Sequence, residues 1–337
     1  MIIKDINKQQ IPIAGNILPI NKDNIIPIKI DKKIEIVVVP NLGEPNSHQD
    51  NVGIILEEKK IQRILSKRYK HVLITEINSM DDLEQLARRK PDLVFSGVKY
   101  FCFNNKKIWL NDYLEIFLIP YIASSKAALD NESDKNRAKN IIQQNNIRTA
   151  DYFITNPGEY IKESSIPIKF PLFIKPITGG DSRGVDKNSL VFNFEEFTAK
   201  VLDIKLNLNT SSLVETYLGG KEYSVGIFED SIDGSLRAMP IEIIVKKNID
   251  GYCILDFDVK KNDEEEVVLV SDKKIFKKLT EIAKNSFVAL GGKSLGRIDI
   301  KMDHLGEPHF IEANLMPGLR KGYFYRSCVL NLDMSYD

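Results

Sequence analysis

The chain has 337 residues, which is more than one hydrophobic core usually supports, so we expect two or three domains of mixed architecture. Its 47 basic and 47 acidic side chains leave a formal net charge of +0, which excludes a chain-wide field that would attract nucleic acid or an anionic membrane. The 3 cysteines lack CxxC spacing, so we expect neither a disulfide framework nor a zinc site. Because long apolar runs are absent, we expect a cytoplasmic protein without a membrane partner.

The first part of the chain has two patterns. Residues 1–33 contain three prolines and predict an extended, irregular leader. From Ile34, an apolar run, a helically spaced segment and a second apolar run, HVLITEI, follow in the order of a β-α-β unit. Further alternation of helix and strand, with Pro91 ending one helix, predicts a parallel α/β domain over residues 34–123.

The rest of the chain predicts two smaller units. Ser133 and Asp134 precede DKNRAKNIIQQNN as the N-terminus of a connecting helix, and Asn193 and Glu196 occupy capping-box positions of a second helix. With the strands DYFIT, FPLFIKP and SLVFN, these helices predict an α+β unit over residues 124–212. Several strands and the amphipathic helix KIFKKLTEIAKNSFVAL predict a last unit over residues 213–337.

Two segments near the C-terminus, LGRIDIKMD and PHFIEAN, alternate polar and apolar residues, which is typical of strands with one buried face. A short loop joins them, so we expect a hairpin. If Asp299 lies opposite Glu312 in this hairpin, then Arg297 lies opposite Asn314. In strict alternation, Phe310 shares the face of Glu312.

Carboxylates that lie opposite each other repel unless a cation lies between them. Carboxylate and amide oxygens suit Mg²⁺, which also binds phosphates. The pattern therefore indicates a nucleotide–metal site formed by Asp299, Glu312 and Asn314. The alternative is a solvated ribbon in which Arg297 makes an ordinary surface ion pair with Glu312, and the hairpin alone supports both interpretations equally.

A glycine-rich loop and a diglycine turn add two weaker signals. Lys175 ends the strand FPLFIKP, and residues 179–184 form a polar loop that can bind phosphates through backbone amides or simply connect two strands. The segment LVETYLGGKEYSV places Glu215 and Glu222 on either side of a turn. There they could contact a purine edge and ribose hydroxyls, or be exposed strand glutamates.

Together these segments resemble the D-alanine:D-alanine ligase family of the ATP-grasp superfamily over about residues 120–324. LGRIDI and FIEANLMPG carry most of the resemblance, with FIKP and its loop, ETYLGGKE, and IPYIAS followed by SDKNRAK in support. The resemblance implies an α/β and α+β chain with an ATP-grasp fold and an N-terminal parallel α/β (pre-ATP-grasp) domain. It also implies ATP, Mg²⁺ with Mn²⁺ as an alternative, and small amino-acid-like substrates, and it allows a homodimer.

Carried over by position, the resemblance implies ATP contacts for Lys135, Lys175, Gly180, Ser182, Gly184, Glu215, Thr216, Leu218 and Glu222. The lysines and the glycine loop would contact the phosphates. Glu215 and the backbone of Thr216 and Leu218 would contact the adenine, and Glu222 would contact the ribose. Asp299, Glu312 and Asn314 would hold two Mg²⁺ ions.

The resemblance also implies the reaction: a carboxylate is activated as an acyl phosphate and then joined to an amine. Arg297 would stabilise the tetrahedral intermediate, and Lys260, from the looser match DFDVKK, would reach the γ-phosphate. Both are the predicted catalytic residues. Catalysis of this kind depends on positioning and charge compensation and needs no protein nucleophile.

The chain departs from the family pattern where substrates are recognised. Asp181 stands where the family pattern has a serine, and Lys261 stands where it has an aromatic residue. Tyr323 and Phe324 stand where it has a Ser-Leu pair. We therefore expect Asp181, Arg297 and Tyr323 to bind substrates that differ from D-alanine. Arg320 or Lys321 could bind a further acid group, although a solvated loop charge is the simpler interpretation, and the segment with Glu44 and Ser47 lacks the usual glycine-rich pattern.

Two other functions fit the same motifs. An ATP-grasp kinase would form ADP and a stable phosphorylated acceptor, whereas a ligase would form ADP, phosphate and an amide. A non-catalytic nucleotide-binding module would bind ATP without turnover. The complete set of charged motif residues argues against the last alternative.

Overall fold

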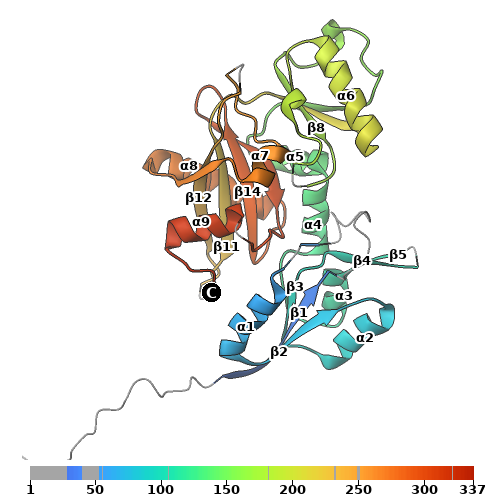
Figure 1. Cartoon of the computed structure of the whole chain (residues 1–337), viewed down its shortest axis with the longest axis vertical. Helices are drawn as coiled ribbons and strands as arrows, with labels where there is room; N and C mark the ends of the chain where they lie inside the picture. The colour runs from blue at the N-terminus through green and yellow to red at the C-terminus, as the bar shows by residue number, and fades with distance from the viewer. Residues whose placement is uncertain are drawn as a thin grey trace, which may run out of the picture.

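The computed structural model describes residues 29–39, 53–54, 56–104, 106–180, 182–230, 233–248, 251–320 and 322–337. Apart from residues 29–33, the predicted leader lies outside these ranges. Three sheets of four or five strands organise the described chain, and Figure 1 shows them as three units joined by the green helices α4 and α5.

The N-terminal sheet is parallel, with the strand order β2-β1-β3-β6. Its strands are β1 (Ile30–Val38), β2 (Tyr69–Glu76), β3 (Leu93–Ser96) and β6 (Tyr121–Ile122). The segments between them form α1 (Glu58–Arg68), α2 (Met80–Arg89), α3 (Leu110–Ile116) and a hairpin of β4 (Tyr100–Phe103) and β5 (Lys106–Trp109). The predicted β-α-β order is therefore confirmed, and α2 ends, as expected, just before Pro91.

The second unit has an antiparallel sheet in the order β7-β10-β8-β9. Helices α4 (Lys126–Ser133) and α5 (Lys135–Gln144) lead into β7 (Tyr152–Thr155), β8 (Leu172–Pro176), β9 (Leu190–Val191) and β10 (Ser212–Thr216). The short 3₁₀ turns η3 (Glu163–Ser165) and η4 (Lys187–Ser189) flank β8, and α6 (Phe194–Leu208) follows β9. Phe197 and Val201 of α6 pack against Ile174 and Val214 of the sheet and bury its inner face.

Side chains cap α5 and α6 where the sequence predicts their N-termini. Asp134 accepts a hydrogen bond from the Arg137 amide at 3.0 Å. Asn193 accepts one from the Glu196 amide at 2.9 Å, while the Glu196 carboxylate accepts one from the Phe192 amide at 2.8 Å. These contacts satisfy amides that helix geometry leaves unpaired, so they define where each helix begins.

The third unit has a five-stranded antiparallel sheet in the order β13-β12-β11-β14-β15. Its strands are β11 (Glu222–Glu229), β12 (Leu236–Ile244), β13 (Glu266–Leu269), β14 (Leu295–Met302) and β15 (Pro308–Asn314). Its helices are α7 (Phe257–Asn262), α8 (Lys273–Ala289) and α9 (Tyr323–Leu332).

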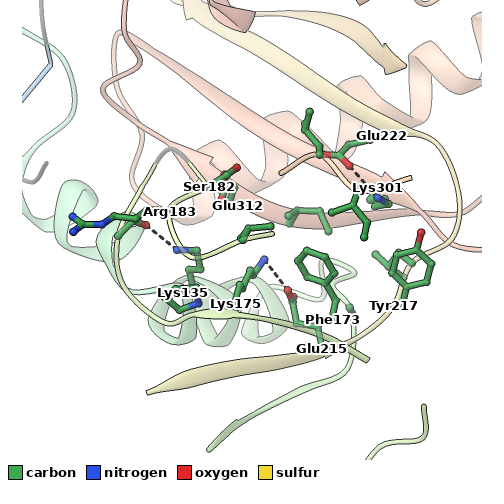
Figure 2. A pocket seen from close by; sticks show the side chains of 18 of the residues that line it. Lys135, Phe173, Lys175, Ser182, Arg183, Glu215, Tyr217, Glu222, Lys301 and Glu312 are labelled. Atoms are coloured by element: carbon green, nitrogen blue, oxygen red, sulfur yellow. Dashed lines mark hydrogen bonds and ion pairs between the residues drawn. The ribbon is translucent and has the colours of Figure 1, made fainter. Parts of the chain in front are cut away.

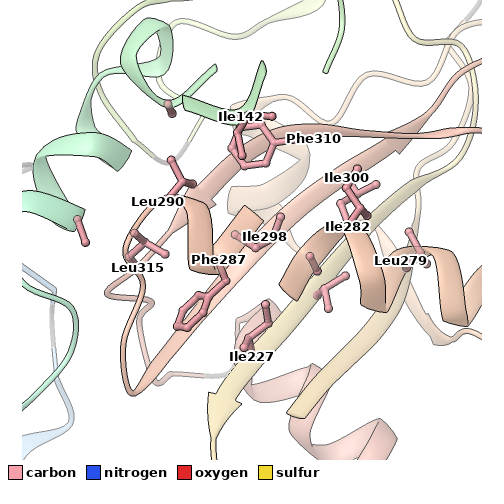
Figure 3. Close-up of a cluster of buried hydrophobic side chains, with 14 of the residues drawn as sticks. Ile142, Ile227, Leu279, Ile282, Phe287, Leu290, Ile298, Ile300, Phe310 and Leu315 are labelled. Carbon is pink, nitrogen blue, oxygen red and sulfur yellow. The ribbon is translucent and has the colours of Figure 1, made fainter. Parts of the chain in front are cut away.

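Helices α8 and α9 cover opposite faces of this sheet. Leu279, Ile282 and Phe287 of α8 pack on Ile298 and Ile300, as Figure 3 shows. These buried contacts hold the hairpin β14–β15 in place. Truncating one such side chain to alanine typically lowers the free energy of unfolding by about 2–5 kcal/mol. The face of the sheet opposite α8 carries the polar side chains of β14.

None of the helices in the described ranges combines the length and the apolar composition that a membrane-spanning helix requires.

Candidate functional site

Two adjoining hollows open beside the hairpin β14–β15. The first, the inter-sheet cleft, has a volume of about 820 Å³ and lies between the second and third units (Figure 2). The second, the adjoining cavity, has a volume of about 1400 Å³ and is bounded by the hairpin, α7, the start of α5 and residues 53–54. The residues that line both hollows are Lys135, Gly179, Gly180, Lys260 and Glu312.

Most of the predicted ATP-binding residues line the inter-sheet cleft. They are Lys135, Lys175, Gly180, Ser182, Glu215, Thr216, Leu218 and Glu222. Gly184 does not line it, but its φ of +80° and the 2.6 Å that would separate an added Cβ from Pro176 show that this position requires glycine. Asp181 lies outside the described residues.

One wall of the cleft contains a buried cluster of three charges. Glu215 forms an ion pair with Lys139 through one carboxylate oxygen, and the other oxygen lies 2.7 Å from Lys175 Nζ. Burial alone would raise the pKa of Glu215, but the two lysines bring it below its ordinary value. The carboxylate that the sequence assigns to adenine is therefore already engaged, and the Thr216 amide donates to the Asp151 carbonyl at 2.9 Å.

A second ion pair lines the other end of the cleft. Lys301 Nζ lies 3.0 Å from a Glu222 oxygen and 5.6 Å from the centre of the Tyr217 ring. Burial would lower the pKa of Lys301, but Glu222 raises it, so the lysine stays charged. Lys301 lies on β14 opposite Glu222, and no role is assigned to it from the sequence. The alternation of charged residues in RIDIK was the signal that could have identified it.

The glycine loop closes over the phosphate end of the predicted site. Lys135 Nζ donates a hydrogen bond to the Gly179 carbonyl at 2.8 Å, which ties the start of α5 to the loop. Gly179 and Ser182 both have positive φ angles, of 102° and 57°. An added Cβ at Gly180 would meet no atom within 4 Å, so the loop leaves open space above Lys135 and Lys175.

The hairpin pairs in the predicted register at its polar end: Asp299 lies opposite Glu312, and Arg297 lies opposite Asn314. Beyond Asp299, a bulge inserts one extra residue, so that Ile300 lies opposite Phe310. The expectation that Phe310 shares the face of Glu312 is therefore wrong. Phe310 is 1% exposed in the α8 core, and the extra residue, Ile311, lines the cleft instead.

Arg297 holds Asp299 through a two-point contact. Its Nε lies 3.0 Å from Oδ1 and a terminal nitrogen lies 2.9 Å from Oδ2, while the Ser224 hydroxyl donates to Oδ1 at 2.6 Å. Because Asp299 is 7% exposed and Arg297 pairs with it rather than with Glu312, the solvated-ribbon alternative is wrong. Burial lowers the pKa of Arg297, but the nearby carboxylates raise it above its ordinary value, so it remains a cation.

Glu312 lies where the two hollows meet. Burial would raise its pKa, but Lys135, Lys260, Lys175 and Arg297 lower it to about 2. None of these cations lies within ion-pair distance of its carboxylate, and in the described part of the chain its oxygens accept no hydrogen bond. An ionised carboxylate with open lone pairs is suited to a bound metal, and anionic phosphates would offset the positive charge around it.

The predicted metal ligands are side-chain oxygens of Asp299, Glu312 and Asn314. Within the described ranges, no group of three or more His, Cys, Asp and Glu side chains is placed to hold a metal ion. The predicted set instead combines two carboxylates with the Asn314 amide, whose oxygen accepts from the Met316 amide at 3.2 Å. Glu312 has free oxygen lone pairs, and Asp299 and Asn314 have further ones. Such oxygen donors fit Mg²⁺, which commonly keeps waters and phosphate oxygens as its other ligands.

Tyr323, one of the predicted substrate-binding residues, lines the adjoining cavity. The Tyr323 hydroxyl points away and donates to Glu265 at 2.9 Å, while the ring centre lies 5.5 Å from the Arg297 guanidinium and 5.9 Å from Lys260 Nζ. Lys261 also lines this cavity. The face of the ring, rather than its hydroxyl, is therefore the surface that a ligand would meet.

An ion pair that the sequence does not indicate also lines this cavity. Lys99 Nζ lies 2.5 Å from Glu132, whose other oxygen accepts a hydrogen bond from the Leu315 amide. The pair joins the N-terminal domain, α4 and the end of β15, and no local pattern in the sequence indicates it. Arg320 is exposed and lines neither hollow, while Lys321, Glu44 and Ser47 lie outside the described residues.

Known proteins resemble this chain in sequence. A family model described as D-ala D-ala ligase C-terminus matches residues 141–337, more than half of the chain. The D-alanine–D-alanine ligase of Aquifex aeolicus is 31% identical over 241 residues, which cover 70% of this chain and 75% of that protein. The enzyme of the same name from Leptospira interrogans is 30% identical over 222 residues, 62% of this chain and 60% of that protein.

Solved structures resemble the fold. The D-alanine–D-alanine ligase of Bacillus anthracis complexed with ATP superposes with a TM-score of 0.62 at 18% identity, covering 88% of this chain and 91% of that one. The VanG D-Ala:D-Ser ligase of Enterococcus faecalis gives a TM-score of 0.63 at 18% identity, covering 91% and 96%. These likenesses confirm the fold class that the sequence predicts.

Proposed function

Because this chain belongs to the D-alanine–D-alanine ligase family of the ATP-grasp superfamily, whose members are ATP-dependent ligases that form carbon–nitrogen bonds, we propose that it forms a peptide or amide bond between amino-acid-like substrates. ATP occupies the inter-sheet cleft and the substrates occupy the adjoining cavity. The bond forms through an acyl phosphate. The adjoining cavity is lined by a few polar groups, among them Lys99, Arg297 and Asn314, which suits small-molecule substrates.

The position of Glu312 carries this proposal. It borders both hollows, as do Lys135 and Lys260, so the phosphate end of a nucleotide in the cleft would face a substrate in the cavity. Transfer of a phosphoryl group between two ligands requires such a shared boundary. The pKa of Glu312, lowered to about 2, keeps its carboxylate charged and able to hold a cation.

The residues of the chain have distinct roles in this mechanism. Lys135 and Lys175 bind and orient the phosphates, and Lys260 on α7 neutralises charge at the transferring group. Glu312, Asn314 and Asp299 would hold Mg²⁺, which supplies charge neutralisation as a Lewis acid when bound. Arg297, kept in place by its two-point contact, stabilises the oxyanion that develops when the amine attacks.

The substrates differ from a pair of D-alanines. Lys261 and the broad face of Tyr323 line the cavity at positions where the family pattern has an aromatic residue and a Ser-Leu pair, so both charge and shape of the cavity are changed. The VanG D-Ala:D-Ser ligase supports this step, because a structural relative of this chain uses a second substrate other than D-alanine. Asp181 completes the predicted substrate contacts.

ADP release in the presence of Mg²⁺ and ATP, measured over a panel of amino-acid pairs that includes D-alanine, tests the function. We expect release that depends on specific amino acids, an amide among the products, and loss of both in Glu312→Gln. A stable phosphorylated acceptor without an amide would favour the kinase, and ATP binding without turnover for any pair would favour a non-catalytic module.

We also propose a cytoplasmic homodimer, because both properties fit the family resemblance and the balanced charge of the chain. Light scattering on the purified protein measures the oligomeric state directly, and a monomer at micromolar concentration would contradict the dimer.

A further inference from the structure

Lys139 is a charged side chain that the mechanism does not use. It lies on α5, one helical turn after Lys135, and its side chain is 0% exposed. It lines neither hollow. Its Nζ forms an ion pair with Glu215, donates to the Thr149 hydroxyl at 2.5 Å and lies 5.1 Å from the centre of the Tyr152 ring. A fully buried lysine is rare, so its contacts call for an explanation.

Glu215 connects this lysine to the inter-sheet cleft. Its two carboxylate oxygens are divided between Lys139, behind the cleft wall, and Lys175, which lines the cleft. Figure 2 shows the contact between Lys175 and Glu215 at the floor of the cleft. The side chains of Glu215 and Lys175 are only 4% and 6% exposed, so solvent screens this cluster poorly.

The charges of the cluster explain why a second lysine is needed. A lone Lys175–Glu215 pair would be neutral, and its lysine would attract a phosphate only weakly. Burial lowers the pKa of Lys139, and the ion pair with Glu215 opposes this shift. With Lys139 charged, two cations and one anion leave a net charge of +1 at the wall of the cleft. The carboxylate then holds Lys175 in place without cancelling the charge that Lys175 presents to a ligand.

We propose that Lys139 is a positioning residue for nucleotide binding, which neutralises Glu215 from behind so that Lys175 keeps its charge for the phosphates of the nucleotide. The inference rests on the proposed function, because it takes ATP as the ligand of the cleft. Lys139 itself touches no ligand. A purely structural ion pair would instead affect folding and would treat ligands with and without phosphates alike.

Calorimetric titration of the full chain with Mg²⁺-ATP and with adenosine separates these roles. In Lys139→Met, which keeps the aliphatic stem, we expect the Kd for ATP to rise by about tenfold or more, since one full charge is removed near the phosphates. The Kd for adenosine should change by less than about twofold, because adenosine carries no phosphate. Equal changes for both ligands, or no change for either, would overturn the inference.

A second pair of variants covers the case in which Lys139→Met does not fold. Glu215→Gln leaves two cations at the wall, and Lys139→Met with Glu215→Gln restores a net charge of +1 without a buried carboxylate. The Kd for adenosine divided by the Kd for ATP should be lower in the double variant than in Glu215→Gln. In the double variant this ratio should equal that of the wild type. An unchanged ratio between the two would contradict a role of the Lys139 charge.

The same titrations distinguish this inference from the proposed function. If the wild-type chain binds neither ligand, both fail. If it binds ATP and releases ADP with amino acids, but Lys139→Met binds ATP as tightly as the wild type, only the positioning role fails. Thermal melting of each variant in the absence of ligand shows whether a loss of affinity merely follows a loss of fold.

Discussion

The hydroxyl of Ser224 makes a contact whose strength can be measured without knowing the substrates. It is 0% exposed, lies opposite Asp299 on β11, and donates to the buried carboxylate at 2.6 Å. A hydrogen bond to a charged group contributes about 1.5–3 kcal/mol, so Ser224→Ala should lower the free energy of unfolding by that amount. The two-point contact with Arg297 remains and limits the loss.

Ser286 on α8 provides a matched control. It is also 0% exposed, and its hydroxyl has no hydrogen-bond partner among the described residues. Removing an unsatisfied buried hydroxyl is neutral or stabilising, so Ser286→Ala should leave the free energy of unfolding unchanged or raise it. Urea denaturation with a shared slope measures both variants. Equal losses in the two variants would refute the contribution assigned to the Ser224–Asp299 contact.

Three further predictions follow from the site and the core. Arg297→Lys cannot reproduce a two-point contact, so kcat in steady-state assays should fall about 10²–10³-fold, and an unchanged kcat would contradict its role. Nearby cations lower the pKa of Glu312 from its ordinary value of 4.5 to about 2, so the stability from its ionisation is complete above pH 4.5 and is lost as the pH falls toward 2. Melting temperatures between pH 6 and pH 3 should therefore fall more steeply in the wild type than in Glu312→Gln. Gly296→Ala would place a Cβ 2.6 Å from the Phe287 ring and should cost about 1–3 kcal/mol in chemical denaturation, whereas Gly318→Ala meets no atom within 4 Å and should be nearly neutral.

The sequence predicts the polar end of the hairpin well because alternation and register are local properties. Asp299 and Glu312 lie opposite each other as expected, and Asp134 caps α5 where its position before a helical pattern suggests. The bulge at Ile311 was missed because the segment was treated as strictly alternating, although the adjacent apolar residues Phe310 and Ile311 interrupt the alternation. The bulge depends on the packing of Phe310 against α8, which leaves one residue of β15 without a partner in the strand pairing. This packing joins residues that are far apart in the sequence.

The charges behind the cleft wall were missed for a related reason. Lys139 occurs in the same DKNRAK segment as Lys135, yet its pattern cannot distinguish a solvated helix face from a buried one. Its partner Glu215 lies far along the chain and comes close to α5 through the pairing of β7 and β10, which places Glu215 opposite Tyr152. Likewise, the Lys99–Glu132 pair depends on how three segments meet in space.

The division between strands and loops explains why the nucleotide is easier to infer than the substrates. The cleft is lined by strand residues such as Lys175, Glu215 and Lys301, whose spacing is set by two antiparallel sheets and is therefore visible in the sequence. The adjoining cavity is formed by α7, the end of β15 and the start of α9, which come together only in the folded chain. Lys261 and Tyr323 lie in this second group. Under the proposed function, a change there would alter substrate choice while the strand-borne charges of the cleft, and with them the reaction class, would be kept.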